Sequence, residues 1–439
     1  MKFLIIIIIS ITLINCSFDN RTGIWKNENP IQKRDQFEKF EKLNVTEKTF
    51  YKTINPPEDL IFKIKIKINS DWNDVFYSKN NNLENFKYNE NYRLISKSKK
   101  LSKYNINERI LYNGNNAYFT DDKGNLIIFS VNENKVIKKF NFYKKKYKKF
   151  SKKLNIIIEN NVVYISDNIG YLYAYDVVKE KIIWAKNLKV PFRSNFKIFK
   201  NKLIAANQNN ELFFFDKING NTINSIPTEE TVIKNKFENN LSMDGDNLFF
   251  LNTYGSLYSI NNNSMKINWF LNLNQTTDLN PSNLFLSNQI VNNNEKIIIS
   301  SNNYLYILDV KNGSLIFKKN ISTQIKPIII EEDKLLFISK TNLLILMNLD
   351  NGEFVYSIDI NQKIADYLNL RKKNAYLKDM MILNNNLFIF LNNSFIIKLN
   401  LNGKIEKVKK LPSKINTYPI LVNNRILYID FKNKISFID

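Results

Sequence analysis

The stretch Val162–Asp176 reads VVYISDNIGYLYAYD and shows the repeating unit of this chain in its clearest form. An apolar segment, Val162–Ser166, is followed by a polar turn that ends at Gly170, and a second apolar segment ends at Asp176. After one more turn comes a third apolar segment, Ile182–Trp184. Short runs rich in β-branched and aromatic residues, separated by turn residues, predict the strands of an antiparallel sheet.

The same frame of apolar strand, turn, apolar strand and turn occurs seven more times along the chain. Successive units start about 40–50 residues apart, which is the spacing of four-stranded propeller blades. A further apolar stretch precedes most units and supplies an innermost strand. We therefore predict an all-β fold, an eight-bladed β-propeller of four-stranded antiparallel blades. The other seven units are Ala117–Ser130, Leu203–Asp216, Leu248–Asn261, Ile297–Asp309, Leu336–Asn348, Leu387–Asn400 and Ile426–Asp439.

Turn glycines and large aromatic residues recur at fixed places in these units. The first turn holds a glycine at Gly124, Gly170 and Gly255. The second turn holds an Asn-Gly pair, which favours a tight hairpin, at Asn219-Gly220, Asn312-Gly313, Asn351-Gly352 and Asn402-Gly403. After that turn a large aromatic residue follows, at Trp184, Trp269, Phe317 and Tyr356. We expect these aromatic side chains to pack between neighbouring blades.

The two ends of the repeat region predict how the ring of blades is closed. The chain stops at Asp439, after only three strands of the eighth unit. An open strand edge there would invite aggregation. The unassigned segment Leu60–Ile68 reads LIFKIKIKI, an alternation of apolar residues and lysines that suits an outermost strand with one wet face. We predict that this N-terminal strand pairs with the C-terminal blade.

The N-terminus has the features of an export signal. Lys2 is followed by an apolar run that is interrupted only by Ser10, Thr12 and Asn15 before the single cysteine, Cys16. A charged start and a short apolar core describe a secretory signal peptide. The residues before Cys16 resemble the bacterial lipobox, which implies lipidation of Cys16 and, with serine as the next residue, anchoring to the outer membrane. We expect a signal peptide in residues 1–15, a lipidated tether in 16–57 and the propeller in 58–439.

The charge of the chain raises the question of its partners. The formal net charge is +23, and removal of residues 1–15, which contain only Lys2 as a charged residue, leaves +22. Such a charge is typical of nucleic-acid binding, but an exported protein does not meet nucleic acid in the cytoplasm. The basic and aromatic stretch Lys138–Lys153 lies between the first two units. We interpret it first as a solvated loop between blades, and second as a contact for anionic lipid or an acidic protein face.

Neither the composition nor the repeat points to catalysis. The chain has no histidine, which removes the commonest general base and metal ligand. Asp176, Asp216 and Asp309 occupy a turn position of the repeat, where a carboxylate accepts hydrogen bonds from turn amides. With Cys16 as the sole cysteine, no disulfide can form within the chain. We therefore predict no catalytic residue, no metal site and no cofactor.

The repeat resembles that of the quinoprotein-like propellers, in which strand, glycine turn, strand ending in Asp, Asn/Asp-Gly turn and Trp recur. Lipobox, N-terminal strand, eight units and the ending NNRILYIDFKNKISFID together resemble the BamB family of outer-membrane β-barrel assembly lipoproteins. The resemblance covers residue 58 to the C-terminus. It implies a non-enzymatic scaffold on the periplasmic face of the outer membrane, which docks on BamA and assists the assembly of unfolded outer-membrane β-barrel proteins.

The resemblance also implies where docking takes place, on the connections after the third and fourth units. In this chain the first holds Thr231, Val232, Ile233 and Lys234, with lysine where the family has arginine, and the second holds Asp278. Two alternatives stay open. One is a degenerate quinoprotein dependent on pyrroloquinoline quinone (PQQ). The other is a periplasmic propeller that binds a different envelope protein or a saccharide.

Overall fold

The computed structural model describes residues 16–18, 25–27, 49–143, 147, 149–230, 237–274 and 284–439. The chain divides into two compact units, Met1–Lys48 and Thr49–Asp439. In the first, β1 (Cys16–Phe18) pairs antiparallel with β2 (Trp25–Asn27). In the parts of the chain that are described, no helix is both long and apolar enough to cross a membrane.

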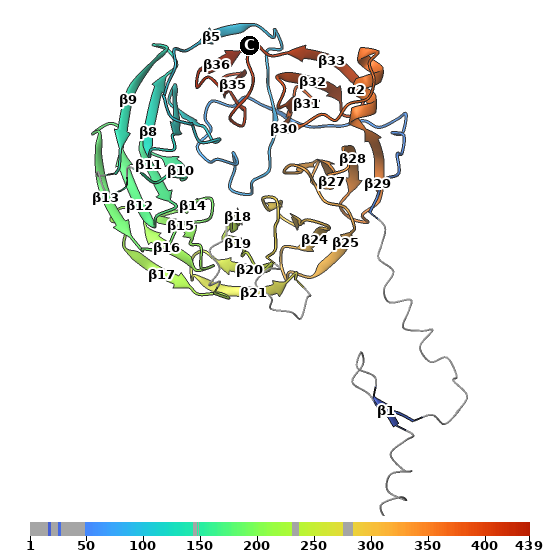
Figure 1. Cartoon of the computed structure of the whole chain (residues 1–439), viewed down its shortest axis with the longest axis horizontal. Coiled ribbons are helices and arrows are strands. Elements are labelled where there is room, and N and C mark those ends of the chain that lie inside the picture. Colours follow the sequence, from blue (N-terminus) through green and yellow to red (C-terminus); the bar gives the residue numbers. More distant parts are fainter. Residues whose placement is uncertain are drawn as a thin grey trace, which may run out of the picture. The chain divides into compact units, whose positions relative to one another are not determined.

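The second unit contains the predicted eight blades, arranged around a central axis (Figure 1). In chain order the strands of each blade run from the axis outward. Blades one to four consist of β6 (Leu111–Asn113), β7 (Asn116–Thr120), β8 (Asn125–Ser130) and β9 (Lys135–Asn141); β10 (Leu154–Glu159), β11 (Val162–Asp167), β12 (Tyr171–Asp176) and β13 (Lys181–Asn187); β14 (Lys197–Phe199), β15 (Lys202–Ala206), β16 (Leu212–Asp216) and β17 (Thr222–Ile226); and β18 (Asn240–Asp244), β19 (Asn247–Leu251), β20 (Ser256–Asn261) and β21 (Lys266–Asn272).

The other four blades follow the same order, except that the eighth takes its outermost strand from the beginning of the propeller. They consist of β22 (Val291–Asn292), β23 (Lys296–Ser300), β24 (Leu305–Asp309) and β25 (Leu315–Lys319); β26 (Ile328–Ile330), β27 (Lys334–Ile338), β28 (Leu343–Asn348) and β29 (Phe354–Asp359); β30 (Leu377–Leu383), β31 (Asn386–Leu391), β32 (Phe395–Asn400) and β33 (Ile405–Lys410); and β34 (Ile420–Val422), β35 (Arg425–Ile429), β36 (Ile435–Ile438) and β5 (Leu94–Lys97).

Burial follows the distance of a strand from the rim of the propeller. Every residue of the third strand of blade one, β8, is buried, because blades pack against both faces of that strand. The outermost strand β13 is mostly exposed and buries only Trp184. Strands buried on both faces read as continuous apolar runs, which explains why the second and third strands gave the clearest repeat.

The aromatic residues after the second turn do pack between blades, as predicted. The Trp184 ring lies on Gly220 of the next blade, where a Cβ would stand 2.5 Å from the ring, and its Nε1 donates to the Lys217 carbonyl at 3.1 Å. Trp269 covers Gly313 in the same way. These glycines have φ near +70°, so the turn needs glycine both for its backbone and for the approaching ring.

The prediction that an N-terminal strand completes the C-terminal blade is confirmed, but the strand we named is wrong. β36 pairs antiparallel with β5, with Phe437 opposite Ser96. Part of Leu60–Ile68 instead forms β3 (Ile66–Lys67), which pairs in parallel with β4 (Asn85–Phe86). β4 in turn pairs with β30, the innermost strand of blade seven. An alternating pattern indicates a strand with one wet face, but it does not specify which of several free edges that strand will join.

One helix, α2 (Ile360–Leu368), interrupts the β-structure after β29 and was not predicted. Asp359 caps it by accepting a hydrogen bond from the Gln362 amide, and Asn369 ends it in the left-handed conformation. The helix lies in the connection between blades six and seven, outside the repeating frame. Nearer the N-terminus, Ile54 exchanges two backbone hydrogen bonds of 2.8 and 2.9 Å with Ser357 of β29.

Candidate functional site: the central channel and its plug

The segment Asn69–Asn89, here called the plug, runs across the central channel of the propeller. It passes the eight blades in turn and contacts the innermost strand, or the turn that follows it, in each blade. The contacted residues, from blade one to blade eight, are Tyr112, Ile158, Lys197, Met243, Asn292, Ile329, Asn384 and Asn423. Six of these contacts are backbone hydrogen bonds of 2.7–3.2 Å.

The position of the plug follows from the geometry of the blades. An innermost strand has a neighbour on one side only, so its other edge presents free N–H and C=O groups to the axis. The plug satisfies part of these groups. Trp72, for example, exchanges two hydrogen bonds with Tyr112 of β6, at 2.7 and 2.9 Å. The Asn82 side chain both accepts from and donates to the backbone of Ile329, as a paired strand would.

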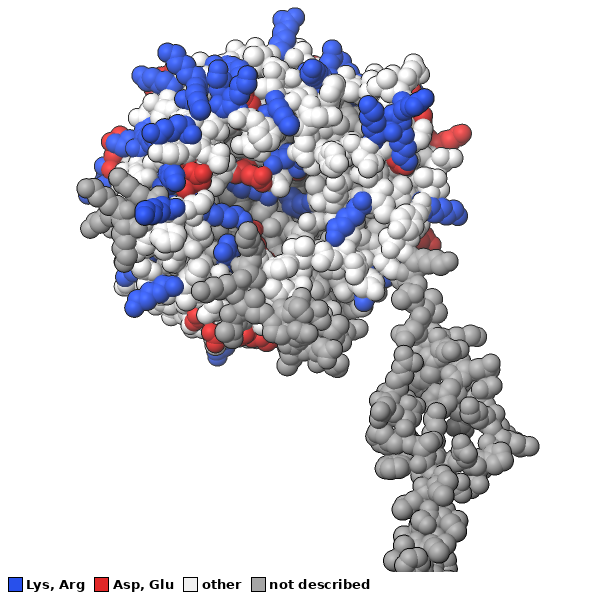
Figure 2. All heavy atoms as spheres, in the orientation of Figure 1, with Lys and Arg blue, Asp and Glu red and all other residues white. Residues whose placement is uncertain are grey.

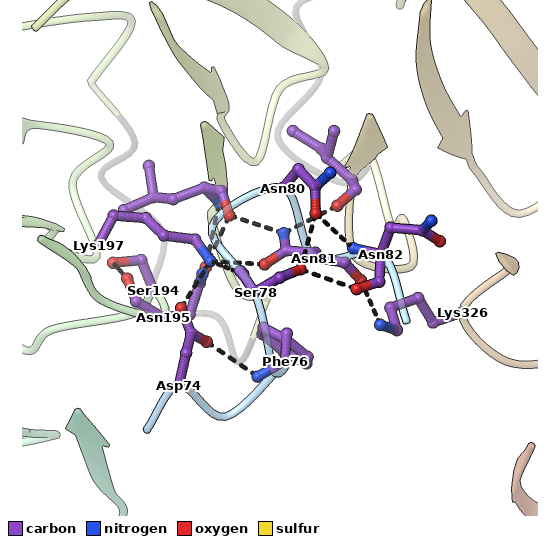
Figure 3. Close-up of polar contacts among 12 residues, drawn as sticks. Asp74, Phe76, Ser78, Asn80, Asn81, Asn82, Ser194, Asn195, Lys197 and Lys326 are labelled. Atoms are coloured by element: carbon purple, nitrogen blue, oxygen red, sulfur yellow. Dashed lines mark hydrogen bonds and ion pairs between the residues drawn. The ribbon is translucent and has the colours of Figure 1, made fainter. Parts of the chain in front are cut away.

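A buried lysine holds the plug to blade three (Figure 3). The Lys197 side chain has no exposed surface, and its Nζ lies 2.7 Å from Asp74 Oδ2 and 2.7 Å from Asn81 Oδ1. The Ser78 carbonyl accepts a third hydrogen bond, at 2.9 Å. All three ammonium protons thus have an acceptor. Burial lowers the pKa of Lys197, and the Asp74 carboxylate opposes this shift.

Asn81 joins three further blades to the plug. It has φ of +60°, a conformation that asparagine tolerates better than most residues. Its side-chain amide donates to the carbonyls of Leu241 and Ile290, at 2.9 and 2.8 Å, in blades four and five. The Lys326 ammonium, from the connection before blade six, donates to its backbone carbonyl. One residue of the plug therefore links blade three to blades four and five and to the connection before blade six.

The other end of the channel is an open pocket of about 600 Å³ with the plug as its floor. Trp72, Phe76 and Leu83 of the plug lie at the bottom. The walls come from residues just before the innermost strands, such as Asn195, and the hollow is visible in Figure 2. We call this side, with the connections between blades and the turns between second and third strands, the pocket face. The opposite side is the plug face.

Charged side chains meet deep in this pocket. The Arg109 guanidinium lies between two rings, 3.6 Å from the centre of Tyr418 and 4.6 Å from that of Phe76. Burial lowers the pKa of Lys326 to about 7, although the neighbouring Asp379 carboxylate opposes the shift. Burial raises the pKa of Asp379, and Arg109 and Lys326 oppose that shift. The pocket thus presents two cations around one carboxylate, which suits a small anionic or polar ligand better than a metal ion.

The predicted docking residues cannot be compared with this arrangement, because they are not among the described residues. Thr231, Val232, Ile233, Lys234 and Asp278 all lie outside the described residues, and so does the side chain of Cys16. The described parts of the same two connections reach the pocket face, where Glu238 and Asn288 line the rim of the pocket.

Glu229 attaches the connection between blades three and four to blade four. Its carboxylate accepts from Asn252, Ser256 and Tyr258, at 2.7–2.8 Å. Burial alone would raise its pKa, but the hydrogen bonds from these side chains outweigh burial, and the pKa of Glu229 is lowered. A Glu229 that stays ionised keeps this end of the connection in place.

The turn aspartates have the structural role that the sequence indicated. Asp176, Asp216 and Asp309 each accept hydrogen bonds of 2.7–3.2 Å from two backbone amides of the following turn. Among the residues described, there is no group of three or more Cys, Asp or Glu side chains that could hold a metal ion.

The basic stretch Lys138–Lys153 is the predicted connection between blades, but it is less solvated than we expected. The Tyr143 ring covers Gly124, and its hydroxyl donates to Asp167 at 2.5 Å. Lys152 is buried. Its ammonium donates to the Tyr147 carbonyl and lies near the Tyr143 ring. Lys149 and Phe150 are exposed. Its aromatic residues thus anchor the stretch while part of its charge faces solvent.

The residues that meet in the pocket and the plug were not identified from the sequence. Arg109, Lys326, Asp379 and Tyr418 each lie before or at the start of a different innermost strand, outside the repeating frame. The cluster of asparagines Asn80–Asn82 was the only signal in the plug, and in a chain so rich in asparagine it does not stand out.

The comparisons with known proteins agree with the architecture. Residues 148–358 match a family model described as outer membrane protein assembly factor BamB. BamB from Moraxella catarrhalis superposes with a TM-score of 0.60 at 14% identity, over 79% of this chain and 99% of that one. Quinohemoprotein alcohol dehydrogenase from Comamonas testosteroni gives 0.59 at 10% identity, over 84% and 80%. The computationally designed Ika8 protein gives 0.60 at 8% identity, over 79% and 99%.

No curated protein matches the chain. At these identities the structural likeness shows the fold alone. The likeness to a quinoprotein raises the question whether the pocket fits a quinone with a calcium ion. The pocket contains Asp379 as its one deep carboxylate, beside Lys326 and Arg109, and these cations oppose a bound metal ion. The described residues therefore do not fit that pair of groups.

Proposed function

Because this chain is a BamB-like propeller of the PQQ-repeat type, we propose that it serves as a non-enzymatic lipoprotein scaffold, anchored through Cys16 to the periplasmic face of the outer membrane. In this role it is an accessory subunit of the β-barrel assembly machinery. It docks on a BamA-like protein and assists the insertion of outer-membrane β-barrel proteins. No cofactor takes part.

The observation that carries this proposal is the match of residues 148–358 to the BamB model. The plug gives it physical support. A propeller enzyme needs its axial channel for substrate and cofactor, whereas here one end of that channel is filled by the chain itself through hydrogen bonds to all eight blades. What such a ring offers to a partner is its surface. The connections 227–239 and 273–290, whose described parts lie on the pocket face, are the proposed docking surface for the BamA-like partner.

Site-specific photo-crosslinking tests this docking surface. A photoreactive residue replaces Val232 in one variant and Asp278 in another, and the variants are irradiated in the native envelope. We expect both to crosslink to the BamA-like protein. Replacement of Ile218, which is 69% exposed in a turn of the plug face, is the matched control and gives no such adduct. Crosslinks from Val232 and Asp278 to a different envelope protein, or from all three positions equally, would refute the docking role.

One alternative function has an observation in its favour. The likeness to quinohemoprotein alcohol dehydrogenase favours a degenerate quinoprotein, although the charges in the pocket do not suit a quinone with a calcium ion. Titration of the purified protein with PQQ and Ca²⁺ distinguishes a quinoprotein enzyme from a scaffold. A stoichiometric change in the quinone spectrum that is lost in the Arg109→Ala variant supports the enzyme, and an unchanged spectrum supports the scaffold. A periplasmic propeller for another envelope protein or a saccharide is the third reading, which the crosslinks also test.

A further inference from the structure

The positive charge of the pocket face is confined to one half of it. Among the described residues, the half that spans the connections from blade six through blades seven, eight and one to blade two holds 15 Lys and Arg and 5 Asp and Glu, in residues 98–110, 121–124, 142–143, 147, 149–153, 168–170, 360–376, 392–394, 411–419 and 430–434. The described residues of the other half hold 4 and 4, in residues 188–196, 207–211, 227–230, 237–239, 252–255, 273–274, 284–290, 301–304, 320–327 and 339–342. Lysine and arginine accordingly gather near β5, β36 and β33 in Figure 2.

The segments of the charged half are joined into one surface, which we call the cationic crescent. The Asn433 side-chain amide donates to the carbonyls of Ser102 and Tyr104, at 3.0 and 2.7 Å. The Phe431 amide donates to the Lys414 carbonyl at 3.2 Å. These contacts connect the turn of blade eight to the connections on either side of it. The crescent is therefore a fixed array of charges and not a set of independent loops.

Two of the five acidic residues of the crescent, Asp121 and Asp430, lie beneath its surface, whereas Glu108 and Asp366 are exposed. The two buried carboxylates accept hydrogen bonds from the amides of their own turns. Glu108 is bridged to Lys378 at 3.2 Å. The cations at the surface are exposed, among them Lys99, Lys100, Lys103, Lys149, Lys153, Arg371, Lys373, Lys414 and Lys432. Exposed cations therefore outnumber exposed carboxylates on the crescent.

Large apolar side chains protrude among these cations. Phe150 and Phe431 are each 60% exposed, and Leu370 and Tyr376 are 66% and 71% exposed. They lie in three different segments of the crescent. Exposed Phe, Leu and Tyr side chains between lysines are what a surface needs to insert into the headgroup region of an anionic bilayer. An acidic protein partner would be matched by the charge but would leave these separate side chains without a common apolar surface to bury them.

We propose that the cationic crescent binds the surface of an anionic phospholipid bilayer. Lysines of the crescent neutralise lipid phosphates, and the protruding Phe150, Phe431, Leu370 and Tyr376 side chains enter the headgroup region. The near-neutral half of the same face, with connections 227–239 and 273–290, stays available for the docking proposed above. A lipid on Cys16, which belongs to the proposed function, would add a second membrane signal, but the crescent does not depend on it.

Vesicle flotation tests the proposal with the mature chain, residues 16–439, carrying Cys16→Ser so that no lipid is attached. We expect binding to vesicles of phosphatidylethanolamine with about a third phosphatidylglycerol, loss of binding as salt is raised, and no binding to phosphatidylcholine vesicles. Each lysine near an anionic surface is worth about fivefold in partitioning. A variant with Lys99→Glu, Lys100→Glu, Lys103→Glu and Lys414→Glu should therefore bind at least tenfold more weakly.

The matched control carries the same change of net charge on the plug face, through Lys179→Glu, Lys200→Glu, Lys311→Glu and Lys404→Glu. It should bind as the parent does. Equal loss in both variants, or equal binding to neutral vesicles, would overturn the proposal. So would displacement of bound vesicles by RNA or polyglutamate at matched charge concentration, because the crescent would then prefer a soluble polyanion.

Insertion of the apolar side chains is measured separately, by tryptophan fluorescence. Phe431→Trp places an indole at the centre of the crescent, and its emission should shift to shorter wavelength on anionic vesicles. An unshifted emission from vesicle-bound protein would refute insertion. None of these measurements involves the BamA-like partner, so a negative result here and a negative result in the crosslinking experiment are separate outcomes.

Discussion

The two faces of the propeller differ in how they use polar residues. The turns of the plug face hold 5 Lys and 9 Asp and Glu, in residues 114–115, 131–134, 160–161, 177–180, 200–201, 217–221, 245–246, 262–265, 293–295, 310–314, 331–333, 349–353, 384–385, 401–404 and 423–424. The described connections and turns of the pocket face hold 19 Lys and Arg and 9 Asp and Glu. Among the described residues, the pocket face is therefore the more positive side of the propeller.

Two lysines, one on each side, show what this difference means. Lys197, beneath the plug, has three acceptors and an ion pair with Asp74, so its charge stabilises the joint between plug and blade. Lys326 lies at the pocket near Arg109. Its pKa is lowered, so it loses its proton more readily than an exposed lysine. The charge of Lys197 is thus neutralised within the molecule, whereas Lys326 lies beside a second cation at the open pocket. The contrast teaches that charge alone does not mark a binding surface, because the contacts already made decide its role.

The largest expected effect comes from breaking the joint at the plug. Lys197→Ala leaves Asp74 buried without its cation, and removal of one partner of a buried pair costs about 3–5 kcal/mol. Lys414→Ala, in the crescent, removes an exposed charge and should change the free energy of unfolding by less than about 0.5 kcal/mol. Urea unfolding followed by tryptophan fluorescence measures both. Similar losses in the two variants would contradict the contrast between the faces.

A smaller effect is expected where two turns of the plug face differ in packing. Gly313→Ala places a Cβ about 2.5 Å from the Trp269 ring, so overpacking adds to backbone strain, and we expect a loss of about 2–3 kcal/mol. Gly245→Ala has a similar positive φ but no heavy atom within 4 Å of the new Cβ, and should cost about 1 kcal/mol. Thermal melts of both variants test this. Trp269→Leu should restore part of the stability of Gly313→Ala but none of Gly245→Ala.

The last expected effect concerns the pH dependence of the pocket. Burial lowers the pKa of Lys326 to about 7 in the folded chain, against about 10.4 for an unfolded lysine. The unfolded state therefore holds this proton more tightly, and the stability of the protein should rise as pH increases from about 7 to about 10. The Lys326→Met variant should lose this rise.

The same shift can be read from the reactivity of the amine. Labelling of Lys326 by an amine-reactive ester, followed by mass spectrometry, should reach half its maximal rate near pH 7, well below the midpoint for exposed lysines. Asp379→Asn removes the carboxylate that favours the charged form and should move the midpoint lower still. An unchanged midpoint in that variant would show that Asp379 does not act on Lys326.

The sequence predicted the features that depend on neighbouring residues and missed those that depend on distant parts of the chain. The eight units, their turn glycines and the aromatic residues between blades were predicted residue by residue, because each depends on neighbours within one hairpin or on the next copy of the repeat. The closing strand was placed wrongly, because Leu60–Ile68 and Leu94–Lys97 both follow the tether and the former has the clearer alternation. The pocket residues went unnoticed, because Arg109, Lys326 and Asp379 are far apart in the chain and belong to no repeat.

By itself the sequence determined that this chain forms blades, how many, and where each turn lies. These properties follow from hydrophobic period and turn chemistry, which act over a few residues. Only the tertiary structure decided which strand completes blade eight, that Asn69–Asn89 crosses the channel, and that the charge collects on half of one face. Free strand edges are chemically alike, so the choice among them, and everything that this choice brings together, depends on the geometry of the assembled ring.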